Sequence, residues 1–275
     1  DATALSRWAG ELAYPSETTT YLNILDTHDG VGLPGVTNVL PDEEIEFLAE
    51  RARQQGAFVS YRSTADGEAP YEINTTWYSA LNLENCGESR ELQVKRFLAS
   101  RSIALALRGV PAIYVHSLIG SRNDVRLALQ TKVKRDVNRA SLDLGVLKRN
   151  LSEPGSKLQL LIEDFGRFLS TRVTHAAFHP NGQQRVLSVS PQLFTVLRTA
   201  PAGHEHILCM TNVSDRPCLA EVATSELGTD SSYWYDLVAG RGWNVEDGKL
   251  HLQFEPYDVL WLMPFRELER AIVVG

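Results

Sequence analysis

Two patterns of apolar and polar residues divide the chain near residue 180. Before that point, compact apolar runs at residues 21–25 and 110–115 alternate with stretches whose apolar residues recur at helical spacing. Compact apolar runs of this kind are typical of parallel strands that are buried on both faces. The alternation predicts strand–helix units and a parallel sheet over residues 1–180.

Three stretches of this first part have the spacing of amphipathic helices: residues 41–54, 91–107 and 157–170. The first has the clearest boundaries. Pro41 is followed by three acidic residues, which the positive end of a helix dipole favours, and Gly56 ends the stretch.

The period changes to two after about residue 180. Apolar and polar residues then alternate in short segments separated by Pro, Gly, Asn or Asp, at residues 185–189, 193–199, 206–211, 219–223, 250–254 and 259–263. This pattern predicts an antiparallel β-sandwich over residues 181–275.

The length of the first part limits its architecture. A complete (β/α)8 barrel takes about 250 residues, whereas residues 1–180 offer about two strong strand–helix units. Two parallel strands cannot cover both faces and both edges of a sheet. We therefore expect the closing portion of a (β/α)8 TIM barrel followed by a β-sandwich, with the N-terminal half of the barrel missing from this chain.

Composition narrows the functional classes. The chain has 27 Lys and Arg against 34 Asp and Glu, a net charge of −7, which disfavours binding to nucleic acid. No apolar run approaches the roughly 20 residues of a membrane-spanning helix. The three cysteines are too few for a disulfide scaffold, so we expect a cytoplasmic protein, although N-x-S/T sequons occur at Asn74 and Asn212.

The most informative stretch is NILDTHDGVGL at residues 23–33, where an apolar run ends in polar residues and glycines. In a parallel barrel, the loop after a strand carries the reacting groups. A neutral imidazole at His28 and a carboxylate at Asp29 offer complementary donors and acceptors to sugar hydroxyls. The alternative is a polar turn in which Asp29 caps a local amide, and the residues alone leave both open.

Four segments in order carry a resemblance to a known family. The stretch at 23–33 resembles the seventh-strand motif of the α-amylase superfamily, glycoside hydrolase family thirteen, and most of all its sucrose phosphorylase branch. YEINTTWYSAL at 71–81 resembles the substrate loop of that branch. GVPAIYVH at 109–116 with LIGSRND at 118–124 resembles its eighth strand and loop, and RDVNR at 135–139 its arginine segment.

The resemblance implies a retaining glucoside phosphorylase, which transfers glucose from a glucoside to inorganic phosphate to give glucose 1-phosphate without cofactor or metal. By the same resemblance, Asp29 is the carboxylate that stabilises the transition state, and His28 and Arg135 bind the glucosyl unit. Tyr71 and Glu72 match positions that contact the acceptor or phosphate.

Two positions depart from the sucrose enzymes: Glu72 stands where Gln is usual, and Ala69 where Asp is usual. The loop is more similar to that of the relatives that phosphorolyse glucosylglycerate. An anionic acceptor beside Glu72 needs a cation, and Arg122, Lys134 and Arg139 are candidates.

No segment matches the family's nucleophilic Asp or its acid/base Glu, so we expect both to lie outside this chain and the 275 residues alone to be inactive. The alternative function is a non-catalytic carbohydrate-binding or assembly module. The oligomeric state stays open, with a homodimer as one option. Histidines at 175, 179, 204 and 206 lack a HExxH pattern, so a zinc site is not expected.

Overall fold

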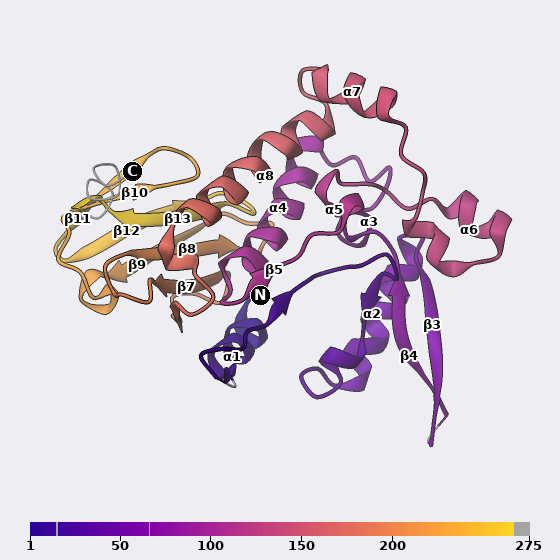
Figure 1. The fold of residues 1–275 in the computed structure, drawn as a ribbon, viewed down its shortest axis with the longest axis horizontal. Helices are drawn as coiled ribbons and strands as arrows, with labels where there is room; N and C mark the ends of the chain where they lie inside the picture. Colours follow the sequence, from indigo (N-terminus) through magenta and orange to yellow (C-terminus); the bar gives the residue numbers. More distant parts are fainter. Residues whose placement is uncertain (15, 66, 267–275) are drawn as a thin grey trace. The chain divides into compact units, whose positions relative to one another are not determined.

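The computed structural model describes residues 1–14, 16–65 and 67–266 (Figure 1). The chain forms two compact units that alternate along the sequence. The first comprises Asp1–Asn23, Leu98–Pro111 and the residues from Phe165 onward, and the second comprises Ile24–Phe97 and Ala112–Asp164. The division expected near residue 180 stays a prediction, since these units are defined by packing and interleave along the chain.

A small antiparallel sheet forms the framework of the second unit. Its strands are β2 (Val31–Gly32), β4 (Gly67–Asn74) and β3 (Phe58–Thr64), in the order β2-β4-β3. Helix α2 (Asp42–Gln54) packs against this sheet, and Figure 1 shows it beside β4. Leu33, Ile45, Ala52, Ala57 and Ile73 bury their side chains between the helix and the sheet.

Short helices complete the second unit, and polar side chains cap several of them. Thr76 caps the first helix, Asp124 the third and Asp143 the last, each by accepting a backbone N–H in the first turn. The helices are α3 (Trp77–Leu81), α5 (Val115–Leu118), α6 (Val125–Thr131) and α7 (Leu144–Ser152), with 3₁₀ turns η1 (Pro34–Val36) and η2 (Lys134–Asn138). The long helices α4 (Arg90–Ala106) and α8 (Lys157–Thr174) contribute residues to both units.

The first unit is dominated by an eight-stranded antiparallel sheet with the order β6-β7-β8-β13-β10-β11-β12-β9. The strands are β6 (Gln183–Val186), β7 (Leu193–Thr199), β8 (His206–Asn212), β9 (Cys218–Ala223), β10 (Tyr233–Asp236), β11 (Gly242–Glu246), β12 (Lys249–Phe254) and β13 (Val259–Pro264), with 3₁₀ turns η3 (Ala176–Phe178) and η4 (Thr224–Leu227). The antiparallel C-terminal sheet is thus present, and its strands form one continuous ladder.

The core of this sheet is apolar and aromatic. Leu208, Trp234, Phe254 and Leu260 are fully buried in one cluster, which also takes in residues from most of the other strands. Burying side chains of this size contributes about 1.5–3 kcal/mol each. Trp261 is also fully buried, with its ring 4.8 Å from that of Phe178. Both indoles therefore serve packing, the usual role of a buried tryptophan.

The parallel pair expected from residues 21–25 and 110–115 exists but is short. Strand β1 (Leu22–Asn23) pairs with β5 (Val110–Pro111) in parallel, near helix α1 (Thr3–Glu11) in sequence. The expectation of strands buried on both faces was wrong for this chain, because Leu22 is 64% exposed and Val110 is 45% exposed. Within the described part of the chain this sheet consists of β1 and β5, and no third strand pairs with either of them.

Two further findings concern the surface. Asn74 and Asn212 are both fully buried with their amides in hydrogen bonds, so neither sequon presents a free side chain for a glycan. Across the described ranges, every helix is too short or too polar to pass through a bilayer.

Candidate active site

A tight turn positions Asp29. Thr27 and Gly30 exchange two backbone hydrogen bonds of 3.0 Å each, and the Asp29 amide donates to Thr27 Oγ1 at 3.1 Å. Gly30 has φ +115°, and a Cβ there would lie 2.2 Å from the Ile73 carbonyl oxygen. Only glycine fits this approach to β4, which explains why a glycine follows the His-Asp pair.

Strand β4 carries the next site residues on alternate faces. Side chains of adjacent strand residues point to opposite sides, so Glu72 faces inward and Tyr71 is exposed. Asn74 lies on the same side as Glu72, and its Nδ2 donates to Glu72 Oε1 and to the Asp29 backbone oxygen, the latter at 2.9 Å. Ser60 Oγ on β3 fixes the Asn74 amide by donating to Oδ1 at 2.9 Å.

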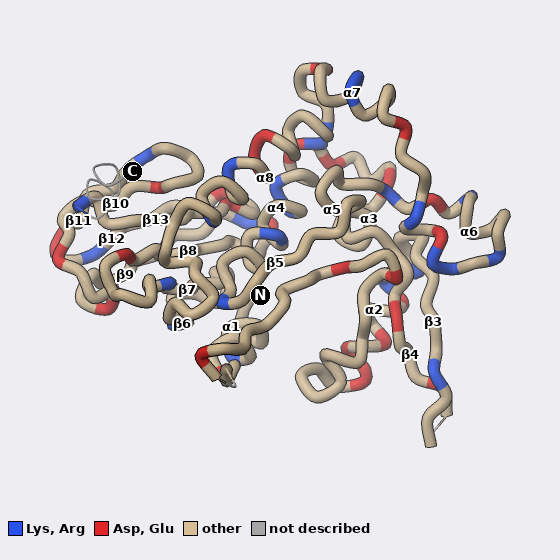
Figure 2. The backbone as a smooth tube through the Cα atoms, in the orientation of Figure 1, with Lys and Arg blue, Asp and Glu red and all other residues tan. Residues whose placement is uncertain are grey.

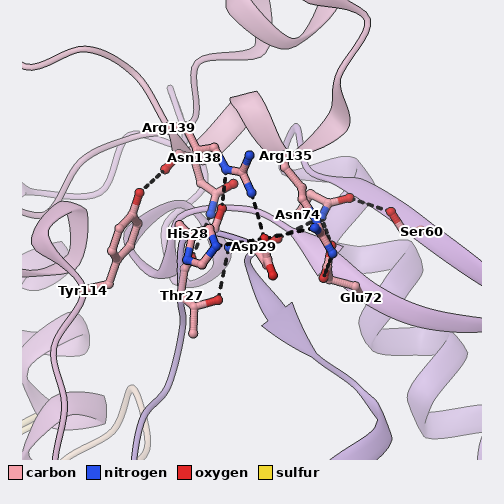
Figure 3. A network of polar contacts seen from close by, with 10 residues as sticks. All are labelled: Thr27, His28, Asp29, Ser60, Glu72, Asn74, Tyr114, Arg135, Asn138 and Arg139. Atoms are coloured by element: carbon pink, nitrogen blue, oxygen red, sulfur yellow. Dashed lines mark hydrogen bonds and ion pairs between the residues drawn. The ribbon is translucent and has the colours of Figure 1, made fainter.

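The 3₁₀ turn η2 and the residue after it supply the cations. Arg135 donates from Nε to Glu72 Oε1 at 3.0 Å and from Nη2 to Glu72 Oε2 at 2.8 Å. Its Nη1 lies 3.1 Å from Asp29 Oδ1. Arg139 Nη2 donates to the same oxygen at 2.7 Å, while its Nε donates to the His28 carbonyl at 2.7 Å. Figure 3 shows both guanidinium groups converging on Asp29.

The two oxygens of Asp29 therefore differ. Oδ1 is held by Arg135 and Arg139, with His28 Nε2 at 3.4 Å. Within the described residues, the hydrogen bond to the Asp29 side chain goes to Oδ1 and none goes to Oδ2. The Asp29 side chain is 34% exposed and that of His28 is 68% exposed. The turn thus presents a carboxylate with one oxygen fixed and the other accessible to a ligand.

Opposite charges balance at this site. Two carboxylates, Asp29 and Glu72, meet two guanidinium groups. The hydrogen bond to Glu72 raises the pKa of Arg135, and the charges of Glu72 and Asp29 act in the same direction while burial opposes them. Strand β4 and the turn η2 are in contact, and Figure 2 shows acidic and basic positions mixed in the part of the second unit around β4 and α6.

A second group of polar side chains supports the turn from α5 and the residue before it. Asp26 is buried, and both of its carboxylate oxygens accept from Ser117 Oγ, at 2.7 and 2.6 Å. Tyr114 Oη donates to the Asn138 carbonyl, and Asn138 Nδ2 in turn donates to the Thr27 carbonyl at 3.0 Å. Burial lowers the pKa of His116, whose Nδ1 lies 2.8 Å from Ser121 Oγ. These contacts tie the turn to the neighbouring helices.

Four of the five residues singled out from sequence come together: His28, Asp29, Glu72 and Arg135. Tyr71 is next to them along β4 and is 38% exposed. Arg139 and Asn74 also belong to the network, whereas the sequence indicated Arg139 only as a charge source and Asn74 only as part of a motif. Their place within the 135–139 and 71–81 segments was the available signal.

Two of the three expected cations for an acceptor at Glu72 are engaged elsewhere. Arg122 donates to Gln93 Oε1 at 2.8 Å and pairs with Glu84, and Lys134 donates to the Val59 carbonyl at 2.8 Å. The cation beside Glu72 is instead Arg135. Among the residues that the structure describes, no group of three or more His, Cys, Asp or Glu is arranged to hold a metal ion.

Comparison with known proteins decides the family. A glucosylglycerate phosphorylase of Spirochaeta thermophila is 32% identical over 272 residues, which is 97% of this chain and 46% of that protein. One from Allomeiothermus silvanus is 37% identical over 79% of this chain and 39% of that protein. The sucrose phosphorylase of Streptococcus mutans is 27% identical over 70% of this chain and 37% of that protein. The chain is a homologue of the glucosylglycerate and sucrose phosphorylases.

The resemblance to the sucrose phosphorylase branch is thus confirmed. This phosphorylase homologue spans less than half the length of these curated relatives. No family model matches the chain.

Solved structures agree on the fold. A sucrose 6F-phosphate phosphorylase from Thermoanaerobacter thermosaccharolyticum superposes with a TM-score of 0.58 at 21% identity, over 76% of this chain and 41% of that one. An AmyP variant in complex with maltotriose gives a TM-score of 0.56 at 18% identity, over 68% of this chain and 37% of that one. The phosphorylase homologue therefore shares its fold with the matching part of each of these two proteins.

Proposed function

We propose that this chain is the C-terminal portion of a retaining glucoside phosphorylase. The reaction transfers glucose from a small glucoside to inorganic phosphate and releases glucose 1-phosphate and the former aglycone. The curated relatives are phosphorylases of glucosylglycerate and of sucrose, which supports this class. The observation that carries the proposal is the Asp29 carboxylate, with Oδ1 held by two arginines and Oδ2 open.

In this proposal, Asp29 stabilises the transition state. Retaining transfer proceeds through an oxocarbenium-like state, in which hydrogen bonds to the 2-hydroxyl group strengthen as positive charge develops on the ring. A fixed carboxylate with one free oxygen can accept such a bond without reorganising, and this preorganisation is the main source of electrostatic catalysis. Arg135 and Arg139 hold the carboxylate in place, while the exposed imidazole of His28 is available to another hydroxyl of the same sugar.

The reaction needs two more carboxyl groups, a nucleophile and an acid/base about 5 Å apart. We propose that both come from residues outside this chain, in the other part of a (β/α)8 barrel that the chain closes. The antiparallel sheet of the first unit then corresponds to the domain that follows the barrel. The share of the relatives that the chain spans supports this arrangement.

The proposed substrate is a glucoside of a small non-fructosyl acceptor such as glycerate. The amide that the sucrose enzymes usually carry can donate and accept, whereas the Glu72 carboxylate only accepts and is already paired with Arg135. This pair leaves Tyr71 as the exposed side chain of that part of β4. Sites that read polar groups discriminate strongly, because a wrong partner leaves those groups unpaired.

The test is phosphorolysis by the complete native protein. Glucosylglycerate and sucrose are each incubated with inorganic phosphate, and the anomer of the glucose 1-phosphate is assigned by NMR. We expect the α-anomer, with kcat/KM at least about tenfold higher for glucosylglycerate. A tenfold preference for sucrose would refute the acceptor assignment, and absence of glucose 1-phosphate from both glucosides would refute the reaction.

A further inference from the structure

Glu72 uses both oxygens of its carboxylate within the protein. Oε1 accepts from Arg135 Nε at 3.0 Å and from Asn74 Nδ2, and Oε2 accepts from Arg135 Nη2 at 2.8 Å. Its side chain is 6% exposed, compared with 40% for Arg135. A bidentate arginine–carboxylate pair fixes the plane of the guanidinium group as well as its position. Glu72 is therefore poorly available to an acceptor and well placed to orient Arg135.

The pairing with Glu72 determines where the third guanidinium nitrogen of Arg135, Nη1, points. With Nε and Nη2 on Glu72, Nη1 faces Asp29 Oδ1 at 3.1 Å, as Figure 3 shows. Asn74 makes a second link between Glu72 and Asp29, because its Nδ2 donates both to Glu72 Oε1 and to the Asp29 carbonyl, the latter at 2.9 Å. Two independent connections thus run from Glu72 to the turn that carries Asp29.

We infer that Glu72 is a positioning residue for the glucosyl site: it orients Arg135, so that Asp29 keeps Oδ1 bound and presents Oδ2 to the sugar. This inference rests on the proposed function, and it changes the part assigned to Glu72. An acceptor contact would affect only reactions of that acceptor. A positioning residue affects glucosyl transfer to every acceptor, including water.

The first measurement needs no activity. The Arg135 Nε–H is followed by ¹⁵N NMR in the native protein, in Glu72→Gln and in the control Glu68→Gln, which lies exposed on the same strand. We expect slow exchange of this proton with solvent in the native protein and in the control. In Glu72→Gln the charged acceptor is lost, and we expect exchange at least about tenfold faster with unchanged backbone amide signals. Equal exchange in all three proteins would overturn the inference.

The second measurement separates positioning from acceptor binding. Release of phosphate from glucose 1-phosphate is measured for the same variants of the complete protein, with water as the acceptor (giving glucose) or with glycerate as the acceptor (giving glucosylglycerate). Misplacement of a catalytic group by about 1 Å can cost on the order of 100-fold in rate. We expect Glu72→Gln to lower kcat by about that factor with both acceptors. A changed KM for glycerate with unchanged kcat for water would contradict the inference and return Glu72 to the acceptor site.

Coupling to Asp29 completes the test. In an Asp29→Asn background, Glu72→Gln should lower kcat by less than about threefold, because residues that act through one another are not additive. Full additivity would overturn the inference. If the complete protein transfers no glucose at all, the proposed function fails, and the exchange of Arg135 Nε–H still decides whether Glu72 positions Arg135.

Discussion

The two units of this chain use charged residues in opposite ways. In the first unit, Arg198 is fully buried and donates to the carbonyls of Gln183, Ala106 and His179 at 2.9–3.2 Å. Asp236 is also fully buried and accepts from the backbone amides of Val238, Ala239 and Trp261, each at 3.1 Å. In the second unit, by contrast, Asp29 and Arg135 are partly exposed and pair with other charged side chains.

The difference in burial and in unused acceptor atoms distinguishes a charged residue that stabilises the fold from one that can bind a substrate. Burial lowers the pKa of Arg198 to about 10 and raises the pKa of Asp236, so each group bears a desolvation cost that backbone partners offset. Both groups are fully buried, so a ligand in solution does not reach them. Asp29 retains an open oxygen beside two fixed cations, and an unused acceptor of that kind is what a substrate needs.

The largest expected effect concerns the chain as a whole. The purified 275-residue chain contains the charged residues of both units. We nevertheless expect its phosphorolysis rate to be several orders of magnitude below that of the complete protein, since a nucleophile and a general acid act as a unit. Glucose 1-phosphate formation under matched conditions measures this. Robust turnover by the chain alone would contradict the proposal that the other two carboxyl groups lie outside it.

Replacing a fully buried arginine should affect stability more than replacing a partly exposed one. Arg198→Met removes a fully buried donor that serves three backbone carbonyls, and we expect a loss of about 3 kcal/mol or more in the free energy of unfolding. Arg139→Met removes a partly exposed ion pair and an exposed hydrogen bond to the His28 carbonyl, and should cost about 1 kcal/mol or less. Urea unfolding followed by the fluorescence of the buried tryptophans and by circular dichroism gives both values. Equal losses of unfolding free energy in the two variants would remove the distinction between the buried and the partly exposed charged residues.

Gly30 tests whether the turn depends on close packing against β4. Gly30→Ala should destabilise the second unit by about 2 kcal/mol, because its Cβ would collide with the Ile73 carbonyl and the backbone is left-handed. Gly67→Ala is the matched control, since Gly67 also has positive φ but open space around a Cβ. Similar losses in both variants would attribute the whole effect to backbone strain.

The smallest expected effect is a pH dependence in the first unit. Burial works to raise the pKa of Glu205, but hydrogen bonds from His175 and the Ala177 amide outweigh it, and the net pKa lies below the ordinary value. Its stabilisation is therefore present above the ordinary glutamate pKa and is lost as pH falls through the lower folded value. The urea midpoint should fall less steeply below pH 5 in Glu205→Gln than in the exposed control Glu246→Gln. Parallel slopes would refute this.

The sequence predicted the regular parts of the fold well. The alternating segment at 193–199 coincides with β7, and the helices expected at 41–54, 91–107 and 157–170 correspond to α2, α4 and α8. Strands β10 and β11 were missed: they have only four and five residues, too few for the alternation on each to stand out. The hairpin of β3 and β4 was missed for a similar reason: its far end is polar and exposed.

The site was predictable as a set of segments and less so as a set of contacts. The motif at 23–33 located Asp29 and the segment at 135–139 located Arg135. Pairing of Arg135 with Glu72 depends on the packing of η2 against β4. The position of the Asp29 turn beside Glu72 depends on the register of β2 and β4, in which Gly32 lies opposite Glu72, and local patterns encode neither. For the same reason Arg139 could be placed near the site but not on Asp29.

The most direct test of the proposed role of Asp29 is the Asp29→Asn variant of the complete protein. Both kcat and the urea midpoint are measured on the same preparation. The amide keeps the shape of the side chain and loses the charge that strengthens its bond in the transition state. We expect kcat to fall by about 100-fold or more while the urea midpoint stays unchanged. An unchanged kcat, or a fall in activity that only follows a loss of folded protein, would show Asp29 to be a structural residue of the turn.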